Sequence, residues 1–133
     1  MRKTKFRALV DDMSLGWVYG NIIYDSNGNP RIQTDKDYDS FVTCLKGTEC
    51  QFTGLYDKDR KVIYEGDIIT NGKLKGDIKF GKYKHYFGNS SSLAIGFYLD
   101  GDENFYLSEI LKRGDFSKIE IIGNKFENPE LLK

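Results

Sequence analysis

Apolar residues recur at every second position in the stretch that decides the fold, 93-LAIGFYLDGD-102. The four odd-numbered residues from Leu93 to Leu99 are apolar and would share one face of a strand, and Asp100-Gly101-Asp102 is typical of a hairpin turn. Similar short runs, separated by turn residues, recur along the chain, and segments with a helical period are nearly absent. The sequence therefore predicts a mainly β protein of antiparallel strands and hairpins.

The C-terminal half is predicted to form a small barrel of the Tudor or KOW type, because five short strands suit a small closed sheet. These strands are expected at residues 67–70, 76–80, 93–99, 104–107 and 119–122. One helical turn is expected at 108–114, between a serine cap and a terminal glycine. A second is expected at the C-terminus, where Asn128 precedes Pro129.

The N-terminal half is predicted to be a set of hairpins. Apolar runs at 6–10 and 17–24 are followed by Asn27-Gly28, a tight-turn sequence, and Pro30 is expected to keep the return strand away from the sheet centre. After a polar loop come further strands, and the last two are joined by a charged turn expected to face solvent. The strands lie at 41–45, 51–55 and 62–64, and the charged turn at 57–61.

Length and composition indicate one soluble domain over residues 1–133, with a subdivision into a hairpin part (1–64) and a barrel (65–125) as the alternative. The 20 basic and 20 acidic side chains cancel, so no global field favours nucleic acid or an anionic membrane. No apolar run approaches the roughly 20 residues that span a bilayer. The basic start is not followed by an apolar signal core, so we expect an intracellular protein.

Two cysteines, Cys44 and Cys50, are too few for a disulfide scaffold, and one histidine, His85, adds little toward a zinc site. We expect reduced, partly buried thiols and no bound metal. Glycine-rich phosphate loops are also absent, so no nucleotide or other cofactor is expected.

A catalytic hypothesis rests on Glu65 and Asp67, which would share a face on a strand, together with His85. Gly66 between the two carboxylates favours a turn instead, in which Asp67 accepts hydrogen bonds from nearby backbone amides. We therefore expect no catalytic residues and no enzymatic activity.

The strongest candidate for a charged interaction surface is the segment 73–87, which holds five lysines and one aspartate among aromatic residues. Cations beside stacking aromatics are typical of single-strand nucleic-acid binding. The alternative is an ordinary solvated strand face, partly neutralised by the acidic residues Asp100, Asp102 and Glu103 folding back. The candidate nucleic-acid-binding residues are Lys73, Lys75, Lys79, Lys82, Tyr83, Lys84 and Tyr86.

Three blocks of the chain together resemble the YopX family. They are Lys5-Phe6-Arg7-Ala8, then Gln51-Phe52-Thr53-Gly54-Leu55 through Tyr64-Glu65-Gly66-Asp67-Ile68-Ile69, then Ile121-Ile122-Gly123-Asn124 through Asn128-Pro129-Glu130-Leu131-Leu132. The resemblance implies a mainly β accessory protein of phages and prophages that works in the cytoplasm of the bacterial host, and it implies no reaction.

With no recognisable site chemistry and many aromatic residues, the leading hypothesis is a protein-interaction module. Its partner would be a second copy, in a homo-oligomer, or a host or phage protein, because edge strands of small β domains pair readily. Some of the aromatic residues are then expected on the surface, among them Trp17, Tyr19, Tyr38, Tyr83, Tyr86 and Tyr98. Nucleic-acid binding is the alternative function, and no membrane partner is expected.

Overall fold

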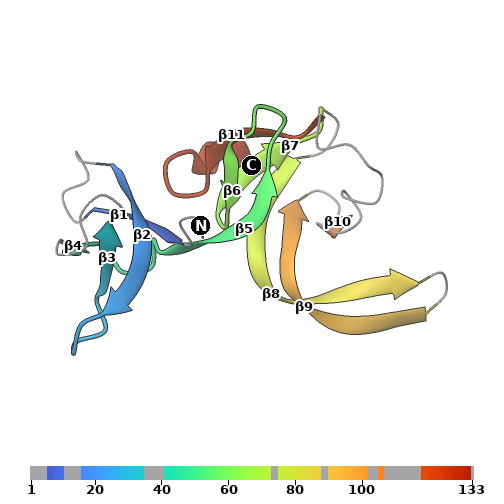
Figure 1. The fold of residues 1–133 in the computed structure, drawn as a ribbon. Helices are drawn as coiled ribbons and strands as arrows, with labels where there is room; N and C mark the ends of the chain where they lie inside the picture. Colours follow the sequence, from blue (N-terminus) through green and yellow to red (C-terminus); the bar gives the residue numbers. More distant parts are fainter. Residues whose placement is uncertain are drawn as a thin grey trace. The chain divides into compact units, whose positions relative to one another are not determined.

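The computed structural model of the chain describes residues 6–10, 16–34, 41–72, 75–87, 90–101, 105–106 and 118–132 (Figure 1). These residues form eleven β-strands and one short 3₁₀ helix in two antiparallel sheets, which confirms the predicted mainly β fold class. The chain divides into two compact units, residues 1–52 and 53–133. Each unit is described by itself.

Unit 1 contains four strands and the start of a fifth: β1 (Phe6–Leu9), β2 (Trp17–Tyr24), β3 (Pro30–Thr34), β4 (Phe41–Thr43) and β5 (Cys50–Tyr56). Their order is β4-β3-β2-β1-β5. Ala8, Ile32 and Cys44 form the buried core, and partly buried apolar residues of β1 and β2 pack against it. Alternation within β1–β3 therefore gives this sheet one apolar face, as the two-residue period predicts.

The turn between β2 and β3 is held by Asp25. Its Oδ1 accepts hydrogen bonds from the backbone N–H groups of Asn27 and Asn29, both at 2.9 Å. Gly28 takes a φ of 80°, so the left-handed position of the turn is filled by glycine. The predicted Asn27-Gly28 turn is confirmed.

The strand that begins with Pro30 lies off the sheet centre, as predicted, but it is the second strand of the sheet and not its edge. β3 pairs with β2 on one side and with β4 on the other. Proline is tolerated because it is the first residue of the strand, where its missing N–H interrupts no ladder. Its carbonyl oxygen still accepts a hydrogen bond from the Cys44 N–H at 3.0 Å.

Both cysteines are buried, free thiols, as predicted. The Cys44 sulfur donates to the Val42 carbonyl at 3.3 Å, and the Cys50 sulfur donates to the Thr48 carbonyl at 3.2 Å. Burial raises the pKa of the Cys44 thiol, because the thiolate would lose its hydration.

Unit 2 contains the rest of β5, then β6 (Val62–Tyr64), β7 (Asp67–Thr70), β8 (Lys75–Phe87), β9 (Ser90–Gly101), β10 (Phe105–Tyr106), β11 (Glu120–Asn124) and η3 (Pro129–Leu132). Five of these strands form a sheet in the order β10-β9-β8-β7-β11. The buried core of unit 2 consists of Ile63, Ile69, Ile78, Leu99 and Ile119. Each of these five strands overlaps one of the five predicted for the barrel, but the bounds of β8, β9 and β10 differ from those predicted.

The sheet of unit 2 is not closed, which corrects the predicted barrel. Closure would require β10 to pair with β11, and the described residues contain no such pair. β10 pairs only with Tyr98 and Leu99 of β9, so it contributes too few residues to close the sheet into a barrel. The predicted turn at the C-terminus is confirmed as η3, and the one at 108–114 lies outside the described residues.

β8 and β9 form one long hairpin. Twelve consecutive pairs join them, from Gly76 opposite Gly101 to Phe87 opposite Ser90. The strands therefore extend well beyond 76–80 and 93–99, and Asp100 and Gly101 belong to β9, where a turn was predicted. The continuous register leaves only residues 88 and 89 between the two strands.

The turn at 57–61 is only partly solvent-facing, because Asp57 is buried. Its Oδ1 accepts hydrogen bonds from the N–H groups of Asp59 and Lys61, at 2.8 and 2.9 Å. Its Oδ2 accepts a longer one, 3.3 Å, from the N–H of Ile121 in β11. One carboxylate thus organises its own turn and ties it to a strand 64 residues away.

Candidate interaction surface on the β8–β9 hairpin

The distal part of the hairpin extends beyond the rest of its sheet (Figure 1). β7 pairs with β8 only as far as Asp77, and β10 pairs with β9 only at Tyr98 and Leu99. Residues 80–87 and 90–97, which we call the outer hairpin, therefore pair only with each other among the described residues.

One face of the outer hairpin carries a row of apolar side chains along β9, with the exposed Lys82 beside them on β8. Directly opposite residues of an antiparallel ladder share a face, which places Phe80 with Phe97 and Lys82 with Ile95. Leu93 has the same parity as Ile95. We call Phe80, Leu93, Ile95 and Phe97 the apolar face.

Exposure increases along this face toward the tip. Phe80 is 52% exposed and packs edge-on against Phe97, with ring centroids 4.9 Å apart. Ile95 is 69% exposed and Leu93 73%, the highest values among the large apolar side chains that the structure describes. The alternation predicted the strand correctly, but core coverage ends at Ile78 and Leu99.

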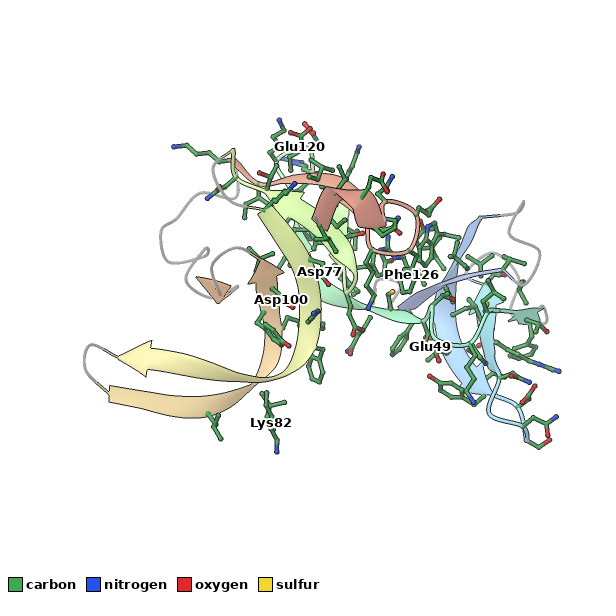
Figure 2. All side chains as sticks on the ribbon, turned by 180° about the vertical axis from the view of Figure 1, so that it is seen from behind. Glu49, Asp77, Lys82, Asp100, Glu120 and Phe126 are labelled. Atoms are coloured by element: carbon green, nitrogen blue, oxygen red, sulfur yellow. The ribbon has the colours of Figure 1, made fainter. Side chains whose placement is uncertain are left out.

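The opposite face carries a charge cluster at the base of the hairpin. Lys79 Nζ forms an ion pair with Asp100 Oδ2, and Asp100 lies opposite Asp77 in the ladder. The hydrogen bond with Asp100 raises the pKa of Lys79. Burial raises the pKa of Asp77, and the charge of Asp100 adds to this while Lys79 opposes it. Figure 2 shows Asp77 and Asp100 on the two neighbouring strands and Lys82 farther out.

The predicted neutralisation of the lysine segment is thus observed at Asp100, whereas Asp102 and Glu103 lie outside the described residues. The described lysines are also divided between two faces. Lys75 and Lys79 share the parity of Asp77, and the exposed Lys82 has the opposite parity.

The other candidate nucleic-acid-binding residues can be located only in part. Lys73 lies outside the described residues, and Tyr83, Lys84 and Tyr86 are placed by their backbone in β8. The structure does not bring the described members of the set onto one surface.

The three residues of the catalytic hypothesis are not brought together. Asp67 is buried, and its Oδ2 accepts a hydrogen bond from the Tyr64 N–H at 2.8 Å, which confirms its role in the turn. The neighbouring Gly66 N–H bonds to the Ile78 carbonyl, whereas His85 lies opposite Ser92 in the outer hairpin. Ile78 and His85 are seven positions apart in β8, which corresponds to about 23 Å between their Cα atoms along an extended strand.

No three His, Cys, Asp or Glu side chains gather closely enough to hold a metal ion in the part of the chain that the structure describes. The same part contains no helix with the length and apolar character needed to cross a membrane. Tyr19 is 43% exposed, which agrees with the expectation that some aromatic residues lie on the surface.

Two features of this surface were missed at the level of sequence. Leu93 and Ile95 were predicted to share one strand face, but their exposure was not predicted. Gly88-Asn89 is itself a two-residue hairpin sequence, and with it the whole of 75–101 could have been read as one long hairpin. No comparable local signal indicates that Asp57 is buried.

Comparison with known protein families gives a match over nearly the full sequence. The family described as YopX protein matches residues 5–133, essentially the whole chain and all three of the resembling blocks. No curated protein matches the chain. The chain belongs to the YopX family.

Proposed function

We propose that this protein is a non-catalytic protein-interaction module, and that the apolar face of the outer hairpin is its contact surface. The observation that carries the proposal is the exposure of Leu93 and Ile95, at 73% and 69%, on one side of a strand. Covering both side chains would contribute roughly 2–4 kcal/mol. Large apolar side chains gathered on one exposed face commonly mark an interaction site.

Membership in the YopX family supports an accessory role in phages and prophages, within the cytoplasm of a bacterial host. The absence of a catalytic role is part of the proposal. Asp67 is already engaged in a turn, so a structural role accounts for the carboxylate most suggestive of chemistry.

Protein is favoured over nucleic acid as the partner by the distribution of charge. A polyanion follows a continuous cationic groove, whereas Lys75 and Lys79 lie on the opposite face from Lys82. Lys79 is further neutralised by Asp100. The apolar residues, in contrast, follow one another along β9 from Leu93 to Phe97, and Lys82 lies beside them on β8.

Affinity capture from the bacterial host tests the proposal, with nuclease added to one half of each sample. The tagged proteins are the wild type, the double variant Leu93→Ser/Ile95→Ser, and a matched control, Tyr19→Ser/Ile23→Ser, which changes two exposed apolar residues of β2 in unit 1. We expect the wild type and the control to retain the same partner after nuclease treatment, and the hairpin variant to lose it.

Loss of every partner on nuclease treatment would contradict the proposal and support nucleic-acid binding. In that case the affinity for single-stranded DNA, measured by fluorescence anisotropy, should fall steeply with salt. The joint substitution Lys75→Ala/Lys82→Ala should then flatten the slope. A monomer that captures nothing would contradict both functions.

A further inference from the structure

We infer that the outer hairpin binds a second copy of this chain, through antiparallel pairing of the edge of β9 that no described strand covers with the same edge of the other copy. This inference rests on the proposed function and names the partner. It follows from a difference between the two edges of the hairpin.

The two strands of the outer hairpin differ sharply in charge. β8 carries Lys82 and Lys84 within the eight residues 80–87, and lysine is a common device that keeps an exposed edge from pairing. β9 from Ser90 to Phe97 reads SSSLAIGF, with no charged residue and no proline. Of the two edges, only that of β9 is therefore suited to pairing.

The segment is also suited to pairing with itself. In an antiparallel pair centred on Ala94, Leu93 of each copy lies opposite Ile95 of the other, and both residues stay on the apolar face. In any other register that keeps the apolar residues of both copies on one face, odd-numbered residues of one copy again lie opposite odd-numbered residues of the other. The contact is isologous, so it closes into a dimer with twofold symmetry.

Repulsion between lysines favours pairing through β9 over pairing through β8. Pairing two β8 edges would bring lysines of the two copies together, which costs stability. In the β9 arrangement the two β8 strands form the outer edges of a four-stranded sheet. They are then about 14 Å apart, beyond the screening length of about 8 Å at physiological salt.

Analytical ultracentrifugation over a wide concentration range tests the inference with purified full-length protein. We expect the wild type to dimerise. Ile95→Lys adds a charge to the β9 edge and should raise the dimer dissociation constant about a hundredfold, about tenfold for each of its two symmetry-related contacts. Ile23→Lys, at an exposed apolar residue of β2, should leave the constant unchanged. Circular dichroism checks that each variant is folded.

Cysteine cross-linking distinguishes edge pairing from stacking of the two apolar faces. Ala94 has the opposite parity to Leu93 and Ile95, so stacking of the apolar faces would leave the two copies of residue 94 on outer surfaces. Edge pairing in the register centred on Ala94 brings the two copies of residue 94 within the 4.4–6.8 Å Cα separation of a disulfide. The native thiols are buried, so we expect Ala94→Cys to form a linked dimer on oxidation, and Lys82→Cys to remain unlinked.

A wild type that is monomeric at all concentrations would overturn the inference, as would a dimer that is unaffected by Ile95→Lys or that Ala94→Cys does not link. If such a protein still retains a nuclease-resistant host partner through Leu93 and Ile95, the proposed function stands and only the second copy is excluded. If it also captures nothing, both fail.

Discussion

Lys79 on β8 forms an ion pair with Asp100 on β9, and Asp100 lies directly opposite the buried Asp77. Lys79 thus pairs with one of these two carboxylates, and its charge lowers the pKa of the other, at the position where the core of unit 2 ends and the outer hairpin begins. Because like charges directly opposite each other repel, the ion pair moderates an unfavourable cross-strand contact. This arrangement also removes one cation from the basic segment of β8.

Replacing Asp100 with Asn should lower the pKa of Asp77, since Asp100 is one of the charges that raise it. We expect the free energy of unfolding to change by only about 0.5 kcal/mol, because the side chains of Lys79 and Asp100 are 41% and 40% exposed and relief of repulsion offsets the lost ion pair. An NMR titration of the Asp77 carboxyl and urea unfolding measure the two effects. An unchanged pKa of Asp77 would contradict the coupling.

Asp77 should make stability fall as pH rises. Burial raises its pKa in the folded protein above the ordinary value of 3.8, so the folded state holds the proton more tightly than the unfolded chain does. Stability is therefore lost as pH rises from about 3.8 through the folded pKa, and it stays lower at neutral pH.

The variant Asp77→Asn cannot ionise, so we expect it to be more stable than the wild type at pH 7, with the difference shrinking as the pH falls toward 3.8. Urea unfolding of both proteins between pH 3 and 7 gives the difference in their free energies of unfolding. The contributions of the other carboxyl groups cancel in this difference. A difference that does not vary with pH would show that Asp77 does not titrate in this way.

Asp57 should be among the most sensitive polar positions of unit 2. Asp57→Ala removes the acceptor for three backbone N–H groups and should lower the free energy of unfolding by roughly 2–4 kcal/mol. Asp59→Ala, at an exposed aspartate of the same turn, should change it by about 0.5 kcal/mol or less. Thermal and urea unfolding compare the two, and equal effects would argue against the buried network.

Gly20 is required by a close approach of two strands. A Cβ atom there would lie 1.9 Å from the backbone oxygen of Gln33 on β3, so Gly20→Ala should force the strands apart and cost about 3 kcal/mol. Gly54 has open space but a φ of 88°, so Gly54→Ala should cost only the backbone strain, about 1–2 kcal/mol. Hydrogen exchange of β3 amides should increase only in the Gly20 variant.

Turns were the part of the fold that the sequence predicted best. The turns at Asn27-Gly28 and at Asp67, and the C-terminal turn after Asn128, all appear where expected. In each case the decisive hydrogen bonds or backbone angles join residues within a few positions of one another, so local sequence contains the necessary information.

Long-range pairing was predicted less well. The barrel was expected to close, and the β8–β9 strands were predicted too short. A strand pattern shows which residues can share a face, but not how many neighbours the strand acquires.

The sequence by itself determined that this chain is a mainly β protein of the YopX family with buried free thiols and turns at defined places. Only the tertiary structure decided that Asp57 is buried and that Phe80, Leu93 and Ile95 are exposed. The physical reason is that burial depends on which distant strand covers a face. Beyond Ile78 and Leu99 no described strand covers the hairpin, so an apolar pattern that elsewhere builds a core here forms a surface.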